Sequence, residues 1–182
     1  MPTPICSERL LLRPATSDDL PALLALWRKS GVCRYLFDGD APTRDQAAHY
    51  RSAQLGVWLL RQPAHHGLLG CATLSRAPRA ALEIRIALHP HHQGHGFAQE
   101  ALTALMAHAT QALGATLFVA SCCVPDAAGN RLLRRLGFAA GYECDGGRYR
   151  VRQYRRERLP HSPPVSPCER SAALPSWRLA VA

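Results

Sequence analysis

A short segment with two glycines is the part of the sequence best suited to chemistry. It follows an apolar, strand-like stretch and opens a helix-like stretch, and it reads Gln93, Gly94, His95, Gly96, Phe97, Ala98. Gly94 and Gly96 place no side chain in the way, so a phosphate could approach the bare backbone N–H groups at the start of the helix. The segment therefore predicts an anion-binding loop.

The elements on either side of this loop must hold it in place. We expect a strand over Ala81–Leu88, the third of an antiparallel meander whose first two strands, Gly56–Arg61 and Leu68–Leu74, are joined by the hairpin loop Pro63–Gly67. After the loop, apolar residues keep one helical stripe from Ala98 as far as Leu113, and Gly114 supplies a C-terminal stop. A continuous apolar strand, 115–123, follows.

The N-terminal part predicts one strand and two helices. The strand is Ser7–Pro14, and Ser17 reads as the N-cap of a first helix that reaches about Lys29 and is stopped by Gly31. Thr43 and Gln46 fit a capping box that starts the second helix. Between the helices we expect a loop over 32–42, which is either a substrate wall or a packed connection.

The C-terminal part predicts a helix, a hairpin and a tail. The helix begins near Asp126, and the hairpin turns at Asp145-Gly146-Gly147 between strands 138–144 and 149–153. Residues 159–182 hold five prolines and four serines with little periodicity, which is typical of a disordered tail.

Composition narrows the class of protein. A chain of 182 residues with 47% hydrophobic content suits one domain with a sizeable core. The longest apolar run, 115–124, is too short to span a bilayer, and the N-terminus shows no secretion signal, so we expect a cytoplasmic protein without a membrane partner. The seven cysteines include no CxxC pair, which argues against a disulfide framework and a cysteine zinc site.

The net charge of +9 is concentrated at the C-terminal end. Residues 148–182 hold eight arginines against Glu157 and Glu169, so the rest of the chain is only mildly basic and a nucleic-acid partner is not expected. Arg148, Arg150 and Arg152 alternate along the last strand. They read either as a solvated sheet edge or as a patch for RNA or an acidic substrate.

Four segments resemble the GNAT superfamily of acyl-coenzyme A dependent N-acetyltransferases, and within it the ribosomal-protein N-terminal (RimJ/RimL-like) branch. They are SERLLLRP (7–14), EIRIALHP (83–90), QGHGFAQEAL (93–102) and NRLLRRLGF (130–138), in the order and spacing of that family. The resemblance covers residues 7–158 and implies an α+β GNAT fold. In that fold, helices flank a mixed, mostly antiparallel sheet whose fourth and fifth strands splay apart.

The resemblance also implies a reaction. It is the direct transfer of an acetyl group from acetyl-CoA, in a ternary complex, to a primary amine of a small molecule or a protein N-terminus. Glu83 lies where relatives carry a general base, which an amine needs because it is mostly protonated at neutral pH. The resemblance assigns the pantetheine contacts to the backbone of Ile86, Ala87 and Leu88, and the pyrophosphate contacts to Gln93, Gly94, His95, Gly96, Phe97 and Ala98.

Two positions, Asp126 and Leu133, depart from the family pattern. Asp126 stands where many relatives carry a cofactor-binding asparagine, Gly129 takes the small or serine position, and Asn130, one helical turn after Asp126, could substitute for the asparagine. Leu133 stands where many relatives carry a tyrosine as general acid, so no acid is assigned. These departures motivate the alternative of a catalytically inactive module that binds acyl-CoA or a partner.

Metal binding is not expected. The histidines near the loop, at positions 89, 91, 92 and 95, have no standard zinc spacing. The sequence identifies neither the amine acceptor nor the preferred acyl chain, and it leaves the oligomeric state open, with a homodimer among the alternatives.

Overall fold

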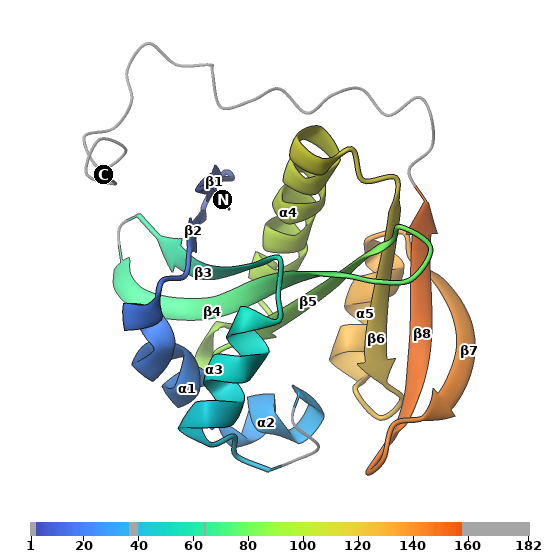
Figure 1. Ribbon diagram of the computed structural model, residues 1–182, viewed down its shortest axis with the longest axis horizontal. Helices are drawn as coiled ribbons and strands as arrows, with labels where there is room; N and C mark the ends of the chain where they lie inside the picture. The colour runs from blue at the N-terminus through green and yellow to red at the C-terminus, as the bar shows by residue number, and fades with distance from the viewer. Residues whose placement is uncertain (1–2, 37–39, 64, 158–182) are drawn as a thin grey trace.

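One sheet of eight strands runs through the computed structural model, which describes residues 3–36, 40–63 and 65–157 (Figure 1). Its spatial order is β1-β2-β3-β4-β5-β6-β8-β7. The strands are β1 (Ile5–Cys6), β2 (Leu11–Pro14), β3 (Gly56–Gln62), β4 (His65–Arg76), β5 (Leu82–Leu88), β6 (Leu117–Cys123), β7 (Ala139–Asp145) and β8 (Arg150–Glu157). Neighbouring strands are antiparallel except for β5 and β6, which are parallel, so the sheet is mixed as expected.

The contact between β5 and β6 is very short. Only Leu82 with Phe118 and Glu83 with Val119 are paired, whereas β5 pairs with β4 along its whole length and β6 pairs with β8 along its whole length. Beyond Glu83 the two strands therefore diverge and open a gap in the sheet. The predicted splay is confirmed. The fourth and fifth strands of the expected fold are β5 and β6 here, because the structure adds the short strand β1.

Helices cover both faces of the sheet, and alternation along the strands explains how. In β3, Trp58 and Leu60 pack in the larger core cluster with α4 (Phe97–Leu113) and α5 (Ala127–Arg135). Val57 and Leu59 point the other way and pack in a second cluster. That cluster contains residues of α1 (Leu20–Trp27), α2 (Ser30–Leu36) and α3 (Arg44–Ser52).

Several elements differ from the sequence-based expectations. The segment expected as a loop after Gly31 begins with helix α2, and the sheet gains β1, which pairs with β2. β4 starts at His65, so the connection from β3 is tighter than the expected Pro63–Gly67 loop. The first helix has Asp19 as its N-cap and is preceded by the 3₁₀ turn Ser17–Asp19. The N-cap of that turn is Thr16, whose N–H donates to Asp19 Oδ2 at 2.8 Å. Ser17 is therefore not the cap.

The interpretation of the last strand as a solvated sheet edge was wrong. β8 is paired on both sides, with β6 and β7, and β7 is the edge strand. Arg152 donates to Glu143 Oε1 with Nε at 3.0 Å, and Arg150 lies 3.4 Å from Glu143 Oε2. Cross-strand ion pairs therefore occupy two of these arginines, while Arg158 and the predicted tail lie outside the described residues.

The capping box expected at the start of the second predicted helix is present at the start of α3. Thr43 N–H donates to Gln46 Oε1 at 2.8 Å and Gln46 N–H donates to Thr43 Oγ1 at 3.2 Å, so the capping box is confirmed. The cysteines in the described residues are free. Over the same residues, no helix has the length and apolar content needed to span a membrane.

Candidate acyl-coenzyme A site

A cavity of about 550 Å³ lies where β5 and β6 diverge. Strand residues 84–88 and 120–123 form two of its walls, the glycine loop closes one end, and helices α2 and α5 contribute side chains. The predicted cofactor residues that line it are Ile86, Ala87, Leu88, Gln93, Gly94, Gly96, Phe97, Ala98 and Asp126. The structure thus brings most of the predicted site together.

The glycine loop has the backbone geometry that requires glycine. Gly94 and Gly96 have φ angles of 81° and 82°, in the left-handed region that other residues rarely adopt. Gly96 is also the N-cap of α4, so the N–H groups of the first helical turn have no intrahelical partners and the helix dipole is positive there. Gln93 Nε2 donates to the Leu88 carbonyl at 3.3 Å and fastens the loop to the end of β5.

His95 has a different place from its neighbours in the loop. Its side chain is exposed, its Nδ1 lies 2.8 Å from the Gln93 carbonyl oxygen, and its ring stacks on Phe97 with 5.9 Å between ring centroids. It is not among the residues that line the cavity. His95 therefore shapes the loop, and the cavity faces the glycines beside it.

Glu83 lies at the point where the strands begin to separate. Its Oε1 accepts hydrogen bonds from Arg85 Nε at 3.2 Å and Nη2 at 2.9 Å, and Ser121 Oγ approaches it at 3.4 Å. The Glu83 side chain is 20% exposed and does not itself line the cavity, whereas Arg85 and Ser121 do. The carboxylate therefore contacts two residues that line the cavity, Arg85 and Ser121, without lining it itself.

Arg85 was missed by the sequence reasoning, although its position was a signal. Residues two apart on a strand share a face, so Arg85 had to lie beside Glu83. Burial acts to lower the pKa of Arg85, but the charge of Glu83 and its hydrogen bonds outweigh that effect and raise it. The guanidinium is therefore a permanent cation at the cavity wall.

Asn130, which the sequence suggested as a candidate cofactor contact, does not line the cavity. It is 5% exposed, and its Nδ2 donates to the carbonyls of Cys123 at 2.9 Å and Asp126 at 2.6 Å. Its Oδ1 accepts a hydrogen bond from Tyr154 Oη at 2.7 Å. Asn130 is not among the cavity-lining residues, because its amide is used to hold the turn between β6 and α5.

The departures from the family pattern also have local structural causes. Asp126 is the N-cap of α5, with Oδ1 accepting from Gly129 N–H at 2.9 Å. A Cβ at Gly129 would lie 2.5 Å from Asp126 Oδ2 and 2.8 Å from Cys122 Sγ, so a larger residue does not fit there. Leu133 lines the cavity and is buried, and it cannot donate a proton.

Helix α5 adds two cations that the sequence reasoning did not single out. Arg131 and Arg135 both line the cavity. Their spacing of four residues places them on one face of the helix, which was the available signal. Together with the loop they give the cavity the positive groups that a coenzyme pyrophosphate requires.

The wall opposite α5 comes from α2. Tyr35 and Leu36 line the cavity there, and the Tyr35 ring lies 5.6 Å from the Tyr149 ring, between centroids. One of the two open interpretations of this segment, a wall of the substrate site, thus has a residue in the right place. Residues 37–39 of the expected loop lie outside the described residues.

Among the residues that the structure describes, the cavity shows no metal cluster, and one of its two thiols is held protonated. Within the described part of the chain, no three histidine, cysteine or acidic residues gather closely enough to hold a metal ion. Cys122 lines the cavity, and burial raises the pKa of its thiol to about 12. A thiol held protonated in this way is a poor nucleophile, which argues against an acylated cysteine.

Comparison with known proteins agrees with this geometry. A model of the acetyltransferase (GNAT) domain matches residues 9–139. The uncharacterized N-acetyltransferase YoaA of Bacillus subtilis (strain 168) is 29% identical over 143 residues, which span 72% of this chain and 80% of the relative.

Solved structures share the fold. The ribosomal L7/L12 alpha-N-protein acetyltransferase RimL, in complex with coenzyme A, gives a TM-score of 0.71 at 22% identity and covers 85% of this chain and 97% of its own. The spermidine N-acetyltransferase from Vibrio cholerae, in complex with CoA and spermine, gives a TM-score of 0.70 at 18% identity, and the match covers 82% of this chain and 95% of the Vibrio cholerae chain. The domain match, which spans more than half of the sequence, is decisive: the chain belongs to the GNAT family of N-acetyltransferases.

Proposed function

We propose that this enzyme transfers an acetyl group from acetyl-CoA to a primary amine in a single ternary complex. The observation that carries the proposal is the cavity between the diverging strands, which ends on the glycine loop at the N-terminus of α4. An elongated anionic thioester fits such a site, with its phosphates at the helix end and its acyl group between the strands.

The backbone of β5 supplies the contacts for the middle of the coenzyme. Residues 84–88 pair with β4 on one side only, because β6 has moved away from the other side. Their outward N–H and C=O groups can therefore pair with the amides of pantetheine, much as a strand pairs with an added neighbour. The loop amides, Arg131 and Arg135 would hold the pyrophosphate.

Glu83 is proposed as the general base. The amine must lose a proton before its nitrogen attacks the thioester carbonyl, and the C–S bond then breaks to release the coenzyme thiolate. Glu83 accepts that proton by way of water, or by way of the Ser121 hydroxyl, which lines the cavity 3.4 Å from Glu83 Oε1 and would turn toward it from Gln153 Oε1. Leu133 cannot protonate the thiolate, and we assign no general acid.

The proposed acceptor is a small-molecule amine or a protein N-terminus. RimL and the Vibrio cholerae enzyme are named for these two classes of acceptor. The cavity continues past the diverging strands toward Tyr35 on α2, which gives an amine a route to the thioester from the side opposite α5. We further propose that the enzyme works in the cytoplasm.

Calorimetric titration with acetyl-CoA tests the cofactor site. Gly94→Asp and Gly94→Asn form a matched pair, because both side chains tolerate the left-handed region and no atom lies within 4 Å of a Cβ there. We expect micromolar binding to the wild type, nearly retained in the Asn variant. In the Asp variant the added negative charge should weaken binding by about tenfold or more.

Two outcomes would overturn the proposal. One is a wild type that does not bind acetyl-CoA. The other is a protein that binds it but releases no free coenzyme thiol with any member of a panel of polyamines, amino acids and peptides. Equal acetyl-CoA binding by the Asp and Asn variants would mean that the phosphates of the coenzyme do not lie at the glycine loop.

A further inference from the structure

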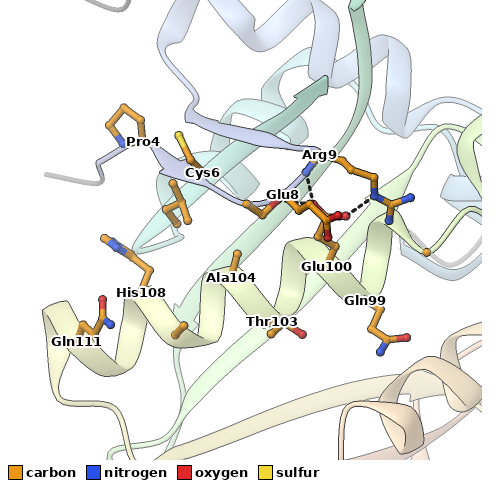
Figure 2. A pocket seen from close by; sticks show the side chains of 14 residues that line it. Pro4, Cys6, Glu8, Arg9, Gln99, Glu100, Thr103, Ala104, His108 and Gln111 are labelled. Carbon is orange, nitrogen blue, oxygen red and sulfur yellow. Dashed lines mark hydrogen bonds and ion pairs between the residues drawn. The ribbon is translucent and has the colours of Figure 1, made fainter. Parts of the chain in front are cut away.

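Arg9 fastens the N-terminal segment to the glycine loop. Its side chain lies at the end of a groove of about 680 Å³ between this segment and the outer face of α4 (Figure 2). Gly96 and Gln99 line both this groove and the acyl-coenzyme A cavity, so Arg9 stands directly behind the loop that closes the cavity.

The Arg9 side chain is held on one side by Glu100. Its Nε donates to Glu100 Oε2 at 2.7 Å, and its backbone N–H donates to Glu100 Oε1 at 2.7 Å (Figure 2). Ser7 Oγ donates to the same Oε1 at 2.6 Å. The carboxylate in the first turn of α4 therefore fixes both the main chain and the side chain of Arg9.

On the other side, Arg9 reaches the backbone between the two glycines. Nη1 donates to the His95 carbonyl at 3.2 Å, and the guanidinium carbon lies 4.8 Å from the centre of the Phe97 ring. In a trans peptide the C=O and the following N–H point in opposite directions. The bond to the His95 carbonyl therefore turns the Gly96 N–H away from Arg9.

We propose that Arg9 is a positioning residue for the coenzyme pyrophosphate. It presets the orientation of the Gly96 N–H before the phosphate arrives. Glu100 already pairs with the Arg9 charge, so the contribution lies in loop geometry more than in attraction from a distance. This inference rests on the proposed use of acetyl-CoA, and it concerns only the pyrophosphate end of that donor.

The test compares donors that differ at the pyrophosphate. Dissociation constants of CoA, 3′-dephospho-CoA and pantetheine are measured for the wild type and for Arg9→Gln, together with kcat and KM for acetyl-CoA and acetyl-pantetheine. We expect Arg9→Gln to bind both pyrophosphate-containing ligands about tenfold more weakly, the loss typical of one misplaced hydrogen bond to a charged group. Pantetheine affinity and kcat with acetyl-pantetheine should be unchanged.

Two further variants sharpen the test. Arg44→Gln removes an exposed arginine at the start of α3 and should bind all three ligands as the wild type does. Arg9→Lys keeps the charge but loses the planar fork that spans Glu100 and His95, so it should restore only part of the affinity. Thermal unfolding of each variant shows whether it is folded.

The outcomes are distinguishable. A wild type that does not bind CoA overturns the proposed function and this inference with it. A wild type that binds CoA while Arg9→Gln binds it equally well overturns the inference alone. An equal loss of pantetheine and CoA affinity in Arg9→Gln also overturns the inference, because it would mean that Arg9 has a general structural role. Full recovery of CoA affinity in Arg9→Lys overturns it as well, because it would mean that the positive charge alone is sufficient.

Discussion

At the scale of single residues, Glu83 carries the sharpest prediction. Glu83→Gln should lower kcat by about a hundredfold or more near neutral pH, because an amide cannot accept the proton of the amine. Acetyl-CoA affinity should stay near normal, since Glu83 does not line the cavity. The deficit should shrink as the pH rises and the amine loses its proton unaided. Steady-state kinetics as a function of pH check this.

Glu143→Gln is a matched control for Glu83. Glu143 is a half-buried glutamate on the edge strand β7, paired with Arg152 on β8, and it is not among the cavity-lining residues. Its replacement should leave kcat unchanged. Unchanged turnover in Glu83→Gln itself would remove Glu83 from the mechanism.

The residue scale is also where the sequence was least sufficient. The position of the loop could be predicted from Gly94 and Gly96, because glycine is the residue that adopts a left-handed backbone most readily. Asn130 could not be placed, since an amide suits a ligand or a buried turn equally well and only the tertiary structure shows Cys123 and Tyr154 around it. From the sequence, Arg131 and Arg135 could be predicted only as charged residues on one face of a helix. The structure shows that this face lines the cavity.

At the scale of elements, strong local signals were sufficient and weak ones were not. The capping box at Thr43 and the stop at Gly114 depend on neighbours in sequence, and both are confirmed. Helix α2 was missed because it is short and contains Gly31, a residue that predicts a helix stop. The arginines of β8 suggested an edge because a pairing partner from elsewhere in the chain is invisible in the local pattern.

The turn between β4 and β5 stores strain that can be tested. Arg79 and Ala80 have φ angles of 61° and 57°, which cost free energy for residues with a Cβ. Ala80→Gly should therefore raise the free energy of unfolding by about 0.5–1 kcal/mol, measured by urea denaturation. Ala48→Gly, inside helix α3, should lower it by about 1 kcal/mol. A destabilised Ala80→Gly would contradict the account.

At the scale of the whole molecule, the order of the strands creates the site. β5 belongs to the half of the sheet built from β1 to β5, and β6 belongs to the half built with β7 and β8. The halves meet through two residue pairs only, so the cavity between them is a consequence of topology. The family resemblance predicted this opening, whereas periodicity alone gave the strands without their order.

Two partly exposed ion pairs in the N-terminal region, Arg13 with Asp19 and Arg9 with Glu100, should make stability depend on pH. Burial acts to raise the pKa values of Asp19 and Glu100, but hydrogen bonds outweigh it and lower them, from Arg13 and Thr16 to Asp19 and from Ser7 and Arg9 to Glu100. Each group then binds its proton more weakly in the folded state than in the unfolded chain. Its stabilisation is complete above the unfolded pKa of about 4 and is lost as the pH falls through the folded value.

The free energy of unfolding should therefore fall steadily from about pH 5 downward, and the fall should be shallower in Glu100→Gln, which has no proton to gain at that position. Glu8→Gln is the control, because Glu8 lies on the same segment and makes no ion pair within the described residues. Urea denaturation at a series of pH values gives the slopes. If the slope of unfolding free energy against pH in Glu100→Gln equals that of the wild type, the contacts of Arg9 with Glu100 do not form in solution. The orientation of the Gly96 N–H would then need another cause.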